Sequence, residues 1–254
     1  MTSIPLQRWG MAFNISKCNV MNITNATKNR IVYNYEMCGK TIKPISEIPY
    51  LGVILNDKLK WNTHIEKMVG SATKTLSFLR RALYKCPQAI KEKAYMAIIR
   101  PKLEYCSSVW DPYQRKYIQK IEMVQRRAAR FVKNIRKYDS SGNNPSITAA
   151  LAEFGWDTLQ DRRRDNRLIL LYKVKKNLIK IPESFLPSSM GDRPMTIVTR
   201  SHASQFQHVT STVDAYKFSF ITRTALDWNS LPEEEITEES TVDSLKMWLA
   251  SQRH

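Results

Sequence analysis

The feature that most limits the fold of this chain is a run of apolar residues spaced by three and four. The run consists of Trp61, Ile65, Met68, Ala72, Leu76, Leu79 and Leu83. Residues at this spacing lie on one face of an α-helix, and a core must cover that face. Asn62 is a suitable N-cap and Pro87 lies just beyond the pattern, so the sequence predicts one long helix between them.

The helical pattern continues along the chain. We expect a second helix from about Gln88 to Ile99, stopped or kinked by Pro101, and a third over roughly Arg115–Asn134. Another helix follows Asp157, and an irregular linker occupies about residues 181–215. Two later segments have the pattern of short packed elements, Tyr216–Leu231 and Val242–Ala250.

The first part of the chain alternates as β-strands do. Cys18–Thr24 and Arg30–Glu36 carry Val, Ile and Tyr, and Asn25–Asn29 suits the turn between them. Tyr50–Leu55 is a short apolar run after Pro49, which predicts a buried strand. The predicted fold class is therefore α+β, mostly α, with a short N-terminal β segment followed by helices.

The chain is strongly basic, with a net charge of +17 over 254 residues. Like charges repel one another in a compact state, so such an excess does not help folding and usually indicates a polyanionic partner. Residues 60–137 hold 19 Lys and Arg against 5 Asp and Glu, so most of the excess lies in the first helical part. The sequence therefore favours RNA, DNA or an RNA–DNA duplex as the partner.

Apolar and basic residues occupy opposite arcs of the third predicted helix. At about 100° per residue, the apolar arc contains Ile118, Ile121, Val124, Ala128, Phe131 and Val132. The basic arc contains Lys116, Lys120, Arg126, Arg127, Arg130 and Lys133. Because a solvated helix face normally mixes charge signs, we predict that these six bind phosphates without reading base sequence. The alternative is a face that contacts another part of a polymerase or the acidic segment Glu233–Glu239.

The sequence does not support a metal, disulfide or membrane site. Its cysteines form no C-x-x-C pair and its histidines are not at metal-ligand spacings, so reduced thiols are expected. It has no apolar stretch of about 18 residues and no signal-peptide pattern. We expect an intracellular protein, in the nucleus or the cytoplasm, that is neither secreted nor membrane-spanning.

Six segments stand out as recognisable blocks. The first three are LQRWGMAFNISKCNVM (Leu6–Met21), YLGVILNDKLKWNTHI (Tyr50–Ile65) and RPKLEYCSSVWDP (Arg100–Pro112). The others are IEMVQRRAARFV (Ile121–Val132), FGWDTLQDRRRDNRL (Phe154–Leu168) and FSFITRTALDWNSLP (Phe218–Pro232). Together, and in this order, they resemble jockey-type non-LTR retrotransposon reverse transcriptases over nearly the whole chain.

The resemblance implies the end of a polymerase palm, a helical thumb and a helical C-terminal region. Residues 1–56 would be a palm remnant, residues 57–137 a basic thumb-like domain, and residues 138–254 the C-terminal region. Lys17 matches the palm lysine that is thought to protonate the departing pyrophosphate. Leu51 and Gly52 fall in the family's primer-supporting strand. For all three residues, a purely local structural role is the alternative.

The sequence departs from the family where catalysis takes place. Phosphoryl transfer by two metals needs converging carboxylates, which the family supplies from a strand aspartate and an Asp-Asp hairpin. No Asp-Asp dipeptide occurs in the chain, and capping accounts for aspartates such as Asp57, Asp111 and Asp161. We expect no catalytic residue and no cofactor here, because Mg²⁺ belongs only to a complete polymerase.

These observations predict a truncated reverse transcriptase that lacks the catalytic aspartates and is not an enzyme as it stands. It would retain sequence-independent nucleic-acid binding. Two alternatives stay open. The chain could be a component of an active polymerase completed by a separate fingers and palm chain, or a transposon relic without a function.

Overall fold

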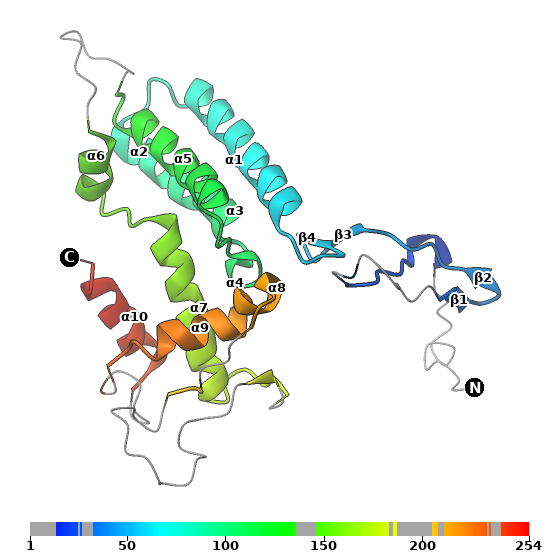
Figure 1. The fold of residues 1–254 in the computed structure, drawn as a ribbon. Helices are drawn as coiled ribbons and strands as arrows, with labels where there is room; N and C mark the ends of the chain where they lie inside the picture. The colour runs from blue at the N-terminus through cyan, green and yellow to red at the C-terminus, as the bar shows by residue number, and fades with distance from the viewer. Residues whose placement is uncertain are drawn as a thin grey trace. The chain divides into compact units, whose positions relative to one another are not determined.

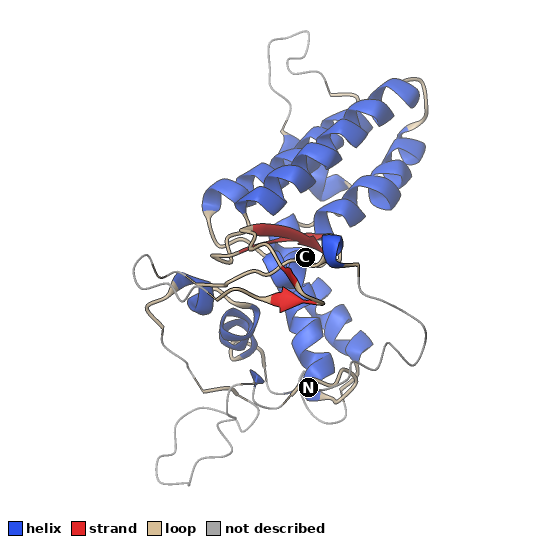
Figure 2. Cartoon of the chain, turned by 90° about the vertical axis from the view of Figure 1, so that its right-hand side faces the viewer, coloured by secondary structure: helices blue, strands red, loops and turns tan. Residues whose placement is uncertain are grey.

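The computed structural model describes residues 14–24, 26, 33–135, 146–182, 185–186, 205–207, 211–232, 234 and 240–253. Helices dominate the described chain, and its strands are short (Figure 2). This confirms the predicted class, α+β and mostly α. The chain divides into two compact units, Met1–His64 and Ile65–His254.

The described part of the first unit contains two antiparallel hairpins. β1 (Glu36–Met37) pairs with β2 (Lys40–Thr41), and β3 (Glu47–Tyr50) pairs with β4 (Val53–Asn56). A 3-10 turn, η2 (Ile15–Lys17), precedes them along the chain (Figure 1).

The strands predicted near the N-terminus are largely not the ones observed. In Cys18–Thr24, the described residues form only an isolated bridge between Val20 and Pro44. Most of the predicted turn Asn25–Asn29 and the first residues of Arg30–Glu36 lie outside the described residues.

The single strand predicted over Tyr50–Leu55 is wrong, because this run is a hairpin that turns at Leu51-Gly52. Tyr50 pairs directly with Val53, which leaves a loop of two residues. Both loop residues have positive φ, 46° at Leu51 and 84° at Gly52, as a type I′ turn requires. Glycine adopts this conformation at little steric cost, so Gly52 permits a turn inside an apolar run.

The second unit is helical where it is described. α1 spans Asn62–Ala82 and belongs to the second unit from Ile65 on. It lies alongside α5 (Arg115–Val132) in Figure 1. The chain returns between them through α2 (Gln88–Ala94), the π-helical η3 (Tyr95–Ile99) and α3 (Arg100–Glu104), and α2 packs against α5.

The long helix predicted from the apolar spacing is confirmed. Its Ile65, Met68, Ala72, Leu76 and Leu79 are all buried. On α5 the predicted apolar arc is also buried, except for Ile118, which is half-buried.

The second predicted helix changes character before its proline. α2 gives way to the π-helical turn η3, and Pro101 then enters α3 near its first residue. A proline ring crowds the carbonyl group four residues earlier and cannot donate a hydrogen bond. The wider π-helical turn over Tyr95–Ile99 relieves that crowding, and the chain stays helical through Pro101 to Glu104.

A second core lies where α7 (Leu159–Lys175) meets the later helices. α7 packs against α4 (Ser107–Trp110), α5, α9 (Phe220–Trp228) and α10 (Val242–Ser251). Two shorter helices, α6 (Ile147–Glu153) on α5 and α8 (Asp214–Lys217) on α9, complete the described part. The core residues are Leu168, Leu171, Tyr172, Phe206, Ala225, Trp228, Leu231, Leu245 and Leu249.

Two expectations fall on segments that are largely not described. The boundary predicted between residues 137 and 138 lies outside the described residues, as does most of the linker predicted near residues 181–215. None of the described helices has the combination of length and apolar character that a membrane crossing needs.

Candidate nucleic-acid interface

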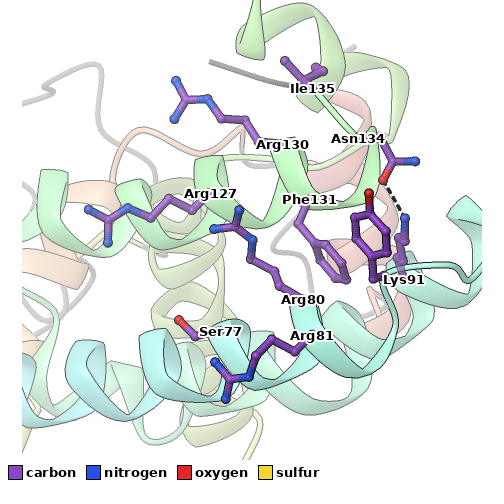
Figure 3. A pocket seen from close by; sticks show the side chains of 10 residues that line it. Ser77, Arg80, Arg81, Lys91, Arg127, Arg130, Phe131, Asn134 and Ile135 are labelled. Carbon is purple, nitrogen blue, oxygen red and sulfur yellow. Dashed lines mark hydrogen bonds between the residues drawn. The ribbon is translucent and has the colours of Figure 1, made fainter. Parts of the chain in front are cut away.

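A pocket of about 1160 Å³ opens beside the last turns of α1 and α5 (Figure 3). Its lining residues are Ser77, Arg80, Arg81, Tyr84, Lys91, Arg127, Arg130, Phe131, Asn134 and Ile135. Five of these ten residues are cations and none is acidic. We call this set the basic pocket.

α1 contributes Arg80 and Arg81 to the basic pocket from its last turn. Both side chains are exposed, and Arg80 reaches into the space between the two helices in Figure 3. A cation in the last turn of a helix gains about 0.3–1 kcal/mol from the helix dipole. Any cation in a last turn has that gain, so it does not account for five cations around one cavity.

α5 contributes Arg127 and Arg130, which are three residues apart and therefore lie on the same face. Arg127 is exposed and Arg130 is half-buried. The Nε of Arg130 is buried and has no hydrogen-bond partner among the described residues. A buried donor without an acceptor costs about 1–3 kcal/mol, so this N–H is available to a ligand that brings an acceptor.

Lys91 of α2 is the most deeply placed cation of the basic pocket, with 1% of its surface exposed. Its Nζ donates a hydrogen bond of 2.6 Å to Oδ1 of Asn134 and lies 5.4 Å from the ring centroid of Phe131. Neutral groups therefore hold this ammonium. Burying an ammonium is unfavourable unless an anion or strong acceptors surround it, so the position suits an anionic ligand.

The end of α5 places the Asn134 side chain over Lys91. Asn134 has a left-handed backbone, with φ 56°. Its N–H donates to the carbonyl of Phe131, and the N–H of Ile135 donates to the carbonyl of Arg130. This is the Schellman pattern, in which Asn is one of the few residues that take the place of glycine. The helix terminus thus fixes a pocket residue.

None of the five cations has a carboxylate within 4.0 Å among the described residues. The positive charges around the basic pocket therefore remain uncompensated in that part of the chain. At close range their mutual repulsion is unfavourable to the fold. An arrangement of this kind is suited to binding an anion with several negative charges.

A second group of arginines surrounds Asp111, which is 8% exposed. Asp111 accepts hydrogen bonds from Nε of Arg163 at 2.8 Å and Nε of Arg167 at 3.0 Å, and it forms an ion pair with Nη1 of Arg223 at 3.1 Å. Arg167 also donates from Nη2 to Asp227 at 2.8 Å. We call this set the buried ion cluster.

The buried ion cluster corrects one expectation and joins distant parts of the sequence. Capping was the role predicted for Asp111. Instead, Asp111 follows the last residue of α4, and its carboxylate forms ion pairs with two arginines of α7 and one of α9. Burial lowers the pKa of Arg223, and the Asp111 carboxylate acts in the opposite direction. The cluster connects residue 111 to residues beyond 160, so ionic contacts bridge the predicted thumb-like and C-terminal parts.

Comparison with known proteins gives one relevant similarity. The chain is 29% identical over 127 residues to the RNA-directed DNA polymerase from mobile element jockey of Drosophila funebris. The match covers 48% of this chain and 14% of that polymerase. The similarity supports a distant relationship to reverse transcriptases.

Two other comparisons found no counterpart. No family model matches the chain, and no solved structure matches it significantly.

The structure separates the six cations predicted on α5 into three groups. Arg127 and Arg130 line the basic pocket, and Lys116 and Arg126 are exposed on α5 outside its lining. Lys120 and Lys133 are the third group. That all six bind nucleic acid together stays a prediction.

Lys120 and Lys133 are engaged in ion pairs. Lys120 contacts Glu66 of α1 at 3.0 Å, and this hydrogen bond lowers the pKa of Glu66. Lys133 pairs with Glu153 of α6. Because each charge has a carboxylate beside it, these two lysines have less attraction left for phosphates.

The sequence did not point to Arg80, Arg81 or Lys91. A signal for Lys91 was nevertheless present, because Lys91, Tyr95, Ile99 and Leu103 are spaced by four. All four are buried, and Lys91 continues the apolar stripe of its helix. A charged residue in register with a core stripe is a useful indication of a buried polar site.

The residues assigned from the palm of the family lie in the first unit. Lys17 is exposed at the end of η2, and Leu51 and Gly52 form the tip of the β3–β4 hairpin and not a strand. The functional role of these three residues stays a prediction. Among the described residues, no three His, Cys, Asp or Glu side chains come together as a metal site would require.

Proposed function

We propose that this chain binds the sugar–phosphate backbone of nucleic acid at the basic pocket, as part of a retrotransposon reverse transcriptase. The observation that carries the proposal is the convergence of five cations from three helical segments on one cavity without a neighbouring carboxylate in the described chain. The similarity to an RNA-directed DNA polymerase indicates which polyanion to expect.

The energetics of phosphate binding fit these residues. Each phosphate that a cation neutralises releases condensed counterions, which makes binding tighter and dependent on salt. Arginine offers a planar fork of donors that matches phosphate oxygens, and four of the five cations are arginines. Binding through phosphates is indifferent to base sequence, so little preference among sequences is expected.

The assignment of parts of the chain to regions of a polymerase belongs to the same proposal. The resemblance of the sequence blocks supports a palm end, a thumb-like helical part that contains the basic pocket, and a C-terminal region. We further propose that the 254 residues do not polymerise DNA alone, because the family's Asp-Asp pair is missing from the sequence. Template-directed extension of primed RNA by the purified chain, with Mg²⁺ and all four dNTPs, would contradict this part.

The test of binding compares two double variants of α5 that remove the same charge. Arg127→Gln/Arg130→Gln changes two arginines of the basic pocket, whereas Arg115→Gln/Arg126→Gln changes two exposed arginines outside it. Affinity for a short RNA–DNA duplex is measured by fluorescence anisotropy at one salt concentration. We expect the pocket variant to bind at least about tenfold more weakly, because hydrogen bonds to charged groups contribute about 1.5–3 kcal/mol each.

The control variant should bind within a few-fold of the unmodified chain. Equal losses in the two variants would mean that the whole basic arc of α5, and not the pocket, makes the contacts. Failure of the unmodified chain to bind any duplex would overturn the proposed function.

A further inference from the structure

The basic pocket is too small and too deep to be filled by a double helix. Its volume of about 1160 Å³ is close to that of small-molecule sites, which measure roughly 300–1,000 Å³. Lys91, with 1% of its surface exposed, can be reached only by a group that enters the cavity. A duplex is stiff over many base pairs, so it can contact the exposed Arg80, Arg81 and Arg127 and the half-buried Arg130, but it cannot bend into the cavity to reach Lys91.

The lining is also more than a set of charges. Tyr84 lines the basic pocket and is 72% exposed, so a planar group can lie against its ring. Phe131 and Ile135 add apolar surface on the α5 side, and Ser77 and Asn134 add neutral polar groups. Cations alternating with an accessible aromatic ring are typical of sites for single-stranded nucleic acid, where bases stack and phosphates meet Lys and Arg.

We infer that the basic pocket holds an unpaired segment of a nucleic-acid strand, such as the single-stranded tail of a template–primer duplex. The phosphates of the unpaired nucleotides meet Arg127, Arg130 and the buried ammonium of Lys91, and a base stacks on Tyr84. This inference rests on the proposed function, since it specifies which form of nucleic acid enters the same site.

The test uses three ligands built on one sequence: a blunt RNA–DNA duplex, and the same duplex with an unpaired tail of four nucleotides at either the 5′ or the 3′ end. We expect the unmodified chain to bind at least one tailed duplex about tenfold more tightly than the blunt one, the effect of one stacked base with its phosphate. The ratio of the two affinities is the measured quantity.

Two variants remove the features that an unpaired segment would use. Tyr84→Leu deletes the exposed ring, and Lys91→Met deletes the buried ammonium at nearly constant volume. Both should reduce the tail preference at least about fivefold while the affinity for the blunt duplex changes little. Arg115→Gln/Arg126→Gln is the control, in which the ratio should be unchanged. Circular dichroism shows whether Lys91→Met is folded, and Tyr84→Leu tests the inference independently because its side chain is exposed.

The outcomes separate this inference from the proposed function. Equal affinity of the unmodified chain for blunt and tailed duplexes, or a tail preference that survives in both variants, overturns the inference alone. Absence of binding to all three ligands overturns the proposed function as well. Loss of the preference in Tyr84→Leu and in folded Lys91→Met, with the preference retained in the control, supports it.

Discussion

The second unit contains two groups of cations, the buried ion cluster and the basic pocket, and they differ in how their charges are balanced. In the buried ion cluster, Asp111 lies within 3.1 Å of three arginines, and Arg163 and Arg167 are 0% and 2% exposed. In the basic pocket, five cations surround a cavity and the described chain places no carboxylate beside them. Arginine therefore has a structural role in the buried ion cluster and a proposed binding role in the basic pocket. The presence or absence of a carboxylate partner distinguishes the two roles.

The difference has a physical basis in the cost of burying charge. A charge taken out of water is tolerated when an opposite charge and hydrogen bonds surround it, as around Asp111. Removal of the shared carboxylate should thus damage folding. Charges beside an open cavity keep part of their hydration until a ligand replaces it, so their removal should damage binding and spare the fold.

The largest expected effect is the loss of stability in Asp111→Asn. This isosteric change leaves three arginines without their shared carboxylate, and breaking a buried ion pair from one side costs about 3–5 kcal/mol. Urea unfolding followed by circular dichroism measures the change. Asp243→Asn is the control, because Asp243 pairs with Lys246 on the surface with 84% of its side chain exposed. If Asp111→Asn unfolded at the same urea concentration as the control, the carboxylate would not stabilise the fold, and the contrast between the buried ion cluster and the basic pocket would be wrong.

The pocket side of the comparison predicts a much smaller change in stability. The free energy of unfolding of Arg127→Gln/Arg130→Gln should lie within about 0.5 kcal/mol of that of the unmodified chain, the range usual for surface substitutions. A slight gain is reasonable, since the change removes the buried, unpartnered Nε of Arg130. The same urea experiment measures it, and a loss comparable to that of Asp111→Asn would show that these arginines hold the fold together.

The smallest effect is expected from Lys120→Gln, within the basic arc of α5 but outside the basic pocket. Glu66 already neutralises Lys120 at 3.0 Å, so the affinity for duplex should stay nearly unchanged. Glu66→Gln is the informative partner variant, because it frees Lys120 and should raise the affinity slightly. A loss of affinity in Lys120→Gln as large as that of the pocket variant would mean that ion-paired lysines contribute as much as free arginines.

The sequence was most informative where a single periodic pattern decides the structure. The apolar spacing from Ile65 to Leu79 required a buried helix face, and that face is buried. The prediction from sequence failed at Leu51-Gly52. The apolar run there contains a turn, and its positive φ values depend on the pairing of β3 with β4. Local composition does not contain that pairing.

The site was predictable in part for the same reason. Arg127 and Arg130 follow from the periodicity of α5 alone. Arg80, Arg81 and Lys91 join them only through the packing of α1 and α2 beside α5, which connects residues between 36 and 50 positions apart in the sequence. The role of Asp111 was missed for a related reason, since its three arginine partners come from helices much later in the chain.

The central claim is tested most directly by the salt dependence of duplex binding. For the unmodified chain, log K should fall linearly with log salt by about 0.9 for each phosphate contacted. Arg127→Gln/Arg130→Gln should flatten this slope by up to about 1.8, which corresponds to two phosphate contacts. Arg115→Gln/Arg126→Gln should leave the slope as it is. Identical slopes for the unmodified chain and the pocket variant would contradict the assignment of the basic pocket as the phosphate-binding site.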